Sequence, residues 1–86
     1  MNQNSKPEPK VFDIADVPKK GEFANCLAQA DYGDKIIYSR GLYAGGPHRE
    51  AAMGACEAGL VALVQKRTGK GNFDYIAQRT RKRIKA

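Results

Sequence analysis

The sequence predicts one small α+β domain in which a helix, a strand and a second helix precede a β-hairpin. Three observations predict it: two segments with helical spacing of small and apolar residues, two β-prone runs around a glycine-rich turn, and a globular composition. The chain has 86 residues, of which 42% are hydrophobic and 28% charged. A chain of this length buries only about 60 to 65% of its unfolded surface, so we expect one core and no deep catalytic cleft.

The chain begins with a polar stretch. Residues 1–10 contain almost no large apolar side chain, and we expect them to form a disordered arm. In residues 11–18, Asp13 and Asp16 lie between apolar side chains before a proline, which indicates a short extended or single-turn segment docked on the core. The domain itself is expected to span residues 11–80, with a basic tail over residues 81–86.

The first helix and the first strand follow from local patterns. Phe23 and Leu27 lie four residues apart, which is typical of a short amphipathic helix over residues 22–30. A turn over residues 31–34 ends this helix. The β-branched and aromatic side chains of residues 36–38 predict a strand over residues 35–40.

The second helix is expected over residues 47–58, with Pro47 in the first helical position, where its missing amide hydrogen costs nothing. This helix contains many small side chains, which let another backbone approach closely, so we expect it to pack on more than one side. A homodimer that forms through this helix is a further expectation. Gly59 is expected to end the helix in a left-handed conformation. The small residues are Ala51, Ala52, Gly54, Ala55 and Ala58.

A β-hairpin follows the second helix. Residues 60–68 begin as an apolar run and become amphipathic, and residues 73–80 provide a second β-prone run. The glycine-rich segment over residues 68–72 has the length of a hairpin turn.

Positive charge is concentrated in the last quarter of the chain. Residues 65–86 hold eight Lys and Arg side chains against Asp74 alone, a net charge of +7, whereas the other 64 residues carry −1. Such asymmetry is typical of a chain end that meets a polyanion. The alternative is a solvated tail that aids solubility.

Two segments carry a resemblance to a known family. The run EAGLVALVQKRTGKGNFDYIAQR, residues 57–79, resembles the end of a winged-helix domain, where the recognition helix leads into a two-stranded wing. The run FANCLAQADYGDKIIYSRG, residues 23–41, is similar to the opening of small winged-helix-like proteins of phages and prophages. The resemblance implies a three-stranded antiparallel sheet, a helix over residues 47–58 near a DNA groove and a wing on the adjacent backbone.

This resemblance and the charge together lead us to expect a cytoplasmic, phage-type transcription regulator that binds double-stranded DNA. A small adaptor or inhibitor that binds a host protein is the alternative function, and charge alone does not separate DNA from RNA. The helix over residues 47–58 has its own alternatives, a buried packing helix or a dimer contact. The charges of the hairpin also have an alternative role, which is to protect an exposed edge strand from aggregation.

The residues expected to contact nucleic acid are basic side chains at the start of the second helix, on the hairpin and in the tail. Strand alternation predicts Lys66 and Arg67 on opposite faces and Lys70 in the turn, and it allows Arg79 and Arg81 to share a face. The full set is His48, Arg49, Lys66, Arg67, Lys70, Arg79, Arg81, Lys82 and Arg83.

Other chemistry is not expected. His48 has no nucleophile and orienting group near it in sequence, so we predict that the protein is not an enzyme. The Gly69–Lys70–Gly71 run lacks the frame of a phosphate-binding loop. Cys26 and Cys56 are expected to be buried, reduced thiols, and neither a metal, another cofactor nor a membrane span is predicted.

Overall fold

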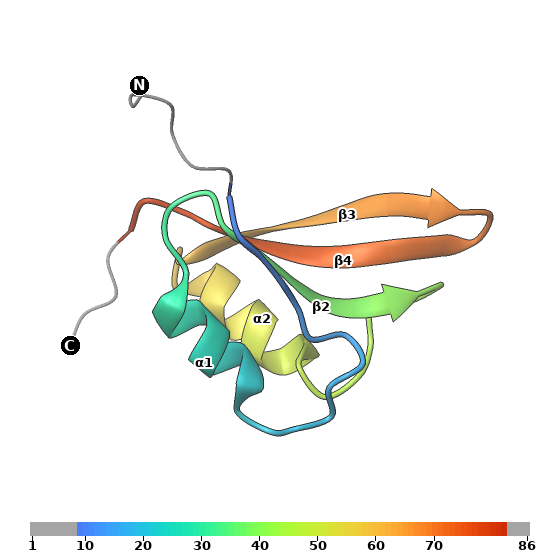
Figure 1. The fold of residues 1–86 in the computed structure, drawn as a ribbon, viewed down its shortest axis with the longest axis horizontal. Helices are drawn as coiled ribbons and strands as arrows, with labels where there is room; N and C mark the ends of the chain where they lie inside the picture. The colour runs from blue at the N-terminus through green and yellow to red at the C-terminus, as the bar shows by residue number, and fades with distance from the viewer. Residues whose placement is uncertain (1–8, 83–86) are drawn as a thin grey trace, which may run out of the picture.

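Two helices pack against one face of a four-stranded sheet in the computed structural model, which describes residues 9–82 (Figure 1). The strand order in the sheet is β1-β2-β4-β3. The α+β class and the succession of helix, strand, helix and hairpin are confirmed. The elements are β1 (Val11–Asp13), α1 (Glu22–Gln29), β2 (Lys35–Gly41), α2 (Arg49–Glu57), β3 (Val61–Gly69) and β4 (Asn72–Arg79).

The prediction of a three-stranded antiparallel sheet is wrong. Val11–Asp13 forms a fourth strand, β1, which pairs in parallel with β2, whereas β2 with β4 and β3 with β4 are antiparallel. The sheet is therefore mixed. Two helices separated by a strand are described in residues 9–82, and the winged-helix assignment is not confirmed by this arrangement.

The core lies between the helices and the adjacent sheet face. Phe23 and Cys26 of α1 are buried there, and the Phe23 ring meets the Tyr38 ring edge-on with centroids 6.3 Å apart. Ala52 and Ala55 are the buried residues of α2, whereas its other small residues are exposed, so packing on more than one side is not seen within residues 9–82. Cys56 is exposed, and the prediction that both thiols are buried is wrong for it.

The ends of α2 are set by two neighbouring residues. His48, in a right-handed helical conformation, occupies the N-cap position, so α2 begins at Arg49 and Pro47 is not its first helical residue. Gly59 has φ of +82°, the left-handed conformation that was predicted to end the helix. The chain then turns at Leu60 into β3.

Asp34 ties the start of the described chain to the turn before β2. Its Oδ1 accepts the backbone N–H of Lys10 and its Oδ2 accepts that of Asp31, both at 2.9 Å. Burial alone would raise the pKa of the Asp34 carboxyl, but these two hydrogen bonds and the Lys10 ammonium outweigh burial and lower it. Lys10, expected in the N-terminal arm, is thus anchored, while residues 1–8 lie outside the described part.

Candidate nucleic-acid interface

The β3–β4 hairpin extends well past both helices (Figure 1). Its strands pair from Val61 opposite Arg79 to Gly69 opposite Asn72, and Lys70 and Gly71 form the turn. We call residues 65–74, the half that contains the turn, the distal hairpin. The distal hairpin contains three of the predicted contact residues, Lys66, Arg67 and Lys70, and all three are exposed.

These three side chains point in different directions. Arg67 lies opposite Phe73, which packs against the core, so Arg67 is on the helix side of the sheet. Lys66 lies opposite Asp74 and therefore on the uncovered side. The register thus gives Lys66 and Arg67 the opposite faces that alternation predicts, with Lys70 in the turn.

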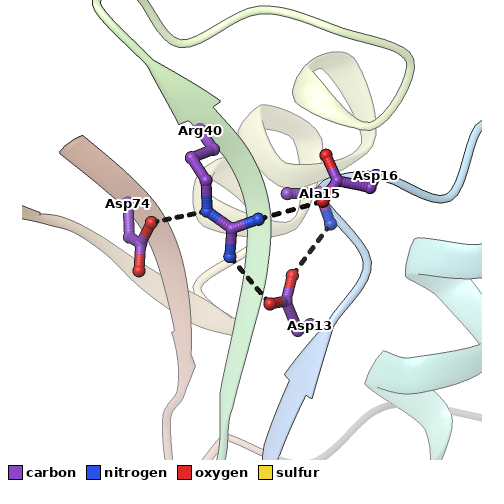
Figure 2. Close-up of polar contacts among 5 residues, drawn as sticks. All are labelled: Asp13, Ala15, Asp16, Arg40 and Asp74. Carbon is purple, nitrogen blue, oxygen red and sulfur yellow. Dashed lines mark hydrogen bonds and ion pairs between the residues drawn. The ribbon is translucent and has the colours of Figure 1, made fainter. Parts of the chain in front are cut away.

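Asp74 is the one carboxylate of the distal hairpin, and Arg40 of β2 holds it. The Nε of Arg40 lies 2.9 Å from Asp74 Oδ1 (Figure 2). The same guanidinium donates to Asp13 Oδ2 at 2.7 Å and to Asp16 Oδ2 at 3.2 Å. The hydrogen bond with Asp13, followed by that with Asp74, raises the pKa of the Arg40 guanidinium further above its already high value. Arg40 therefore joins β1, the segment after it, β2 and β4.

The consequence for the distal hairpin is a surplus of positive charge. Lys66, Arg67 and Lys70 are exposed, and none of them forms an ion pair with a side chain of residues 9–82. Within the described residues, the only hydrogen bond from their side chains runs from Arg67 Nε to the Gly69 carbonyl oxygen, at 3.4 Å. Their charged groups are thus available to an external anion.

Two predicted contact residues are buried instead. His48 is 1% exposed, and its Nε2 lies 2.6 Å from the carbonyl oxygen of Val17. Arg79 is 8% exposed, and its Nη1 donates to the carbonyl oxygens of Leu60 and Thr80. Neither side chain is placed to contact a nucleic acid, so the prediction for both is corrected.

The physical reason for the burial of Arg79 is strand alternation. Arg79 follows Tyr75 and Ala77 at two-residue intervals, and both belong to the core on the helix side. Its guanidinium lies at the corner after α2, where the carbonyl oxygens of Leu60 and Thr80 accept its hydrogen bonds. Arg79 Nε is the one buried side-chain nitrogen or oxygen of the described chain without a hydrogen-bond partner.

The tail is separated from the distal hairpin. Arg81 stacks over the Tyr32 ring at 4.7 Å, and Lys82 Nζ donates to the carbonyl oxygen of Ala58 at 2.7 Å. Both residues follow the end of β4 that pairs with Val61, about 26 Å along the strand from Gly69. Arg81 is exposed and Arg79 is not, so the two do not share a face. Arg83 lies outside the described residues.

The exposed side of α2 carries mixed charge. Arg49 is exposed in the first turn, but Glu50 and Glu57 are exposed as well. Phosphate groups would repel these two carboxylates. The helix that the resemblance assigns to a DNA groove therefore has a weakly anionic surface.

Sequence reasoning missed the role of Arg40. Its three carboxylate partners come from β1, the following loop and β4, and Asp74 is 34 residues away along the chain. No local pattern signals such a cluster. Within residues 9–82, no group of three or more His, Cys, Asp or Glu side chains is placed to hold a metal ion.

Comparison of the chain with known protein families, curated proteins and solved structures gave no match. Neither α1 nor α2 is long and apolar enough to cross a membrane.

Proposed function

We propose that this protein binds nucleic acid, and specifically duplex DNA, through the distal hairpin. The observation that carries the proposal is the set of three exposed cations, Lys66, Arg67 and Lys70, without ion-pair partners among residues 9–82. They sit on a hairpin that extends past the helices, so a duplex can approach them without meeting the body of the domain (Figure 1). Backbone phosphates are the expected contacts.

The Arg40 cluster supports this proposal. Asp74 lies directly opposite Lys66, where a free carboxylate would attract the lysine and repel a phosphate. Because Arg40 binds Asp74 at 2.9 Å, part of the negative charge beside Lys66 is offset within the fold. The distal hairpin then offers a net positive surface.

In this proposal the hairpin has the role of the wing in a winged-helix protein, and the protein acts as a small phage-type transcription regulator. Base reading by α2 is not part of the proposal, because Glu50 and Glu57 face solvent there. Binding is expected to depend weakly on base sequence, since phosphate contacts carry little sequence information. Arg81 and Lys82 form a second basic group at the other end of the hairpin. This group contacts the same duplex only if the duplex runs along the whole hairpin.

The test compares two variants with the same change in net charge. Lys66→Gln/Lys70→Gln removes two charges of the distal hairpin, and Lys19→Gln/Lys20→Gln removes two exposed charges from the segment before α1. Fluorescence anisotropy with a labelled DNA duplex of about 20 base pairs is measured at several salt concentrations. We expect the hairpin variant to lose at least tenfold in affinity and its salt slope to fall by about 1.8, at about 0.9 per phosphate contact.

The control variant should stay within about threefold of the parent protein. Equal losses in the two variants would mean that net charge alone drives binding and would overturn the proposal. Duplex RNA and single-stranded DNA of the same length, measured in parallel, decide whether the ligand is duplex DNA.

A further inference from the structure

The outer edge of β3 is a second surface of the molecule, which overlaps the distal hairpin at the far end of the strand. The strand order places β3 at one margin of the sheet (Figure 1). It is nine residues long, whereas β1 at the opposite margin has three. A long strand at a sheet edge presents backbone donors and acceptors to which another strand can pair.

The hydrogen bonds around Arg79 identify which backbone groups face outward. Arg79 donates its N–H to the Asp34 carbonyl oxygen and accepts from the Gly33 N–H, so both of its backbone groups point toward β2. Val61, which lies opposite Arg79, consequently turns its N–H and C=O away from β4. The two-residue period of a strand gives Leu63 and Gln65 the same orientation.

These outward groups lack hydrogen-bond partners within residues 9–82. No bond from the backbone of Val61, Leu63 or Gln65 to a residue outside the hairpin is found there, and β4 is the only strand that pairs with β3. The first four residues of β3, Val61–Val64, also carry no charge, and Val64 is 44% exposed. Charged side chains, which usually protect an edge from pairing, begin only at Lys66.

Positive charge stands at both ends of this edge. Lys82 lies against Gly59, just before β3, where its Cδ is 3.2 Å from the position that a Cβ would take. Lys66 and Arg67 stand at the other end. Edge pairing with a second copy in antiparallel register about Leu63 would bring Arg67 opposite Gly59, and therefore beside Lys82. Like charges disfavour that self-pairing.

We propose that the β3 edge binds an extended segment of a partner protein as a fifth strand, and that this segment has an apolar middle and acidic ends. Apolar side chains of the segment would lie beside Val61–Val64, and its carboxylates beside Lys82 at one end and beside Lys66 and Arg67 at the other. Main-chain hydrogen bonds to Val61, Leu63 and Gln65 provide affinity, and the terminal charges select the partner. This goes beyond nucleic-acid binding and does not depend on it.

The experiment uses a synthetic peptide, EDVTVTVDE, and a matched peptide with Lys in place of each Asp and Glu. Binding to the full chain is followed by NMR, with amide hydrogen exchange measured at Leu63 and Gln65. We expect the acidic peptide to bind, to slow exchange at both amides at least tenfold, and to bind at least tenfold more tightly than the basic peptide. Equal binding of the two peptides, or no slowing of exchange, overturns the proposal.

Gln65→Pro provides the backbone test. The Gln65 N–H points outward, so proline removes a donor for the added strand and leaves the hydrogen bonds to β4 in place. We expect at least a tenfold loss of peptide affinity in Gln65→Pro and less than a twofold loss in the control Gln65→Ala, with DNA affinity retained in both. Full peptide binding by a folded Gln65→Pro variant contradicts the proposal.

Two further measurements keep the proposal open to refutation. Should Gln65→Pro not fold, Lys82→Glu tests the charge at the far end of the edge, and it should weaken the acidic peptide at least threefold. Hydrogen exchange at the amides of Leu63 and Gln65 is also measured without peptide. Slow exchange at both amides in a dimer would show that a second copy occupies the edge, and this result also overturns the proposal.

Discussion

The Nη1 of Arg79 lies 3.2 Å from the carbonyl oxygen of Leu60, so a residue at the end of β4 holds the corner that follows α2. We predict that Arg79→Met leaves affinity for a DNA duplex within about twofold of the parent protein, because the guanidinium is buried. The free energy of unfolding should fall by about 1 kcal/mol, since two hydrogen bonds are lost while the cost of burying an unpaired Nε is removed.

Urea denaturation and anisotropy titration of the same Arg79→Met sample check this prediction. A tenfold loss of affinity at unchanged stability would show that Arg79 contacts the ligand after all. Arg67→Met, an exposed position on the distal hairpin, is the opposite control. It should weaken binding and leave stability within about 0.5 kcal/mol.

Asp34 is predicted to make stability depend on pH. Its pKa is lowered in the folded state, so the unfolded chain takes up the proton at higher pH than the folded chain does. The stabilisation is therefore complete above roughly pH 5 and is lost as the pH falls through the folded pKa. At neutral pH, Asp34→Asn should lower the free energy of unfolding by about 2 kcal/mol, because an amide replaces a buried carboxylate that accepts two backbone hydrogen bonds.

The matched control is Asp31→Asn, in the same turn. The Asp31 carboxylate is 85% exposed, so the change should cost less than about 0.5 kcal/mol. Chemical denaturation at pH 7, 5 and 3 measures both variants. The difference in the free energy of unfolding between the parent protein and Asp34→Asn should decrease at the lowest pH. A difference that is constant across the pH series would exclude this role of Asp34.

Local patterns predicted most of the elements, and the reason is visible in single residues. The four-residue spacing of Phe23 and Leu27 depends only on α1, and the left-handed conformation of Gly59 depends only on the end of α2. The parallel strand β1 differs, because the local pattern of residues 11–18 predicted only an extended or single-turn segment and not its pairing with β2. Its three residues pair with β2 about 24 positions later, and the Lys10–Asp34 hydrogen bond supports the pairing across the same interval.

The candidate interface was predictable in part, for the same reason. Lys66, Arg67 and Lys70 are exposed because the hairpin extends past both helices. Burial of Arg79 was also within reach, because it continues the alternation of the buried Tyr75 and Ala77. Burial of His48 was not, since it depends on Val17, 31 residues away, and on how the segment after β1 crosses the start of α2.

Asp74 is predicted to limit affinity for nucleic acid. Asp74→Asn removes the carboxylate opposite Lys66, and Arg40 keeps its bonds to Asp13 and Asp16. Affinity for a DNA duplex at low salt should rise about threefold, because the distal hairpin gains one unit of positive charge. Asp16→Asn makes the same change of charge in the same cluster at an 88% exposed carboxylate away from Lys66, and its effect should be smaller.

Anisotropy titrations at two salt concentrations measure the pair of variants. The gain in Asp74→Asn should shrink at high salt as the charges are screened. An unchanged or lowered affinity in a folded Asp74→Asn protein would contradict the prediction that the Asp74 carboxylate weakens phosphate binding beside Lys66.

The two cysteines are predicted to differ in reactivity. Cys26 is 4% exposed, and burial, with a smaller contribution from Glu22, raises the pKa of its thiol, so both access and thiolate content are low. Cys56 is exposed on α2. A thiol reagent such as dithiobisnitrobenzoate should label Cys56 in the native protein at least about a hundredfold faster than Cys26.

In Cys56→Ser, labelling should become slow and rise with urea in step with global unfolding, because Cys26 lies in the core between α1 and the sheet. Fast native labelling of that variant would mean that α1 opens independently of the rest of the domain.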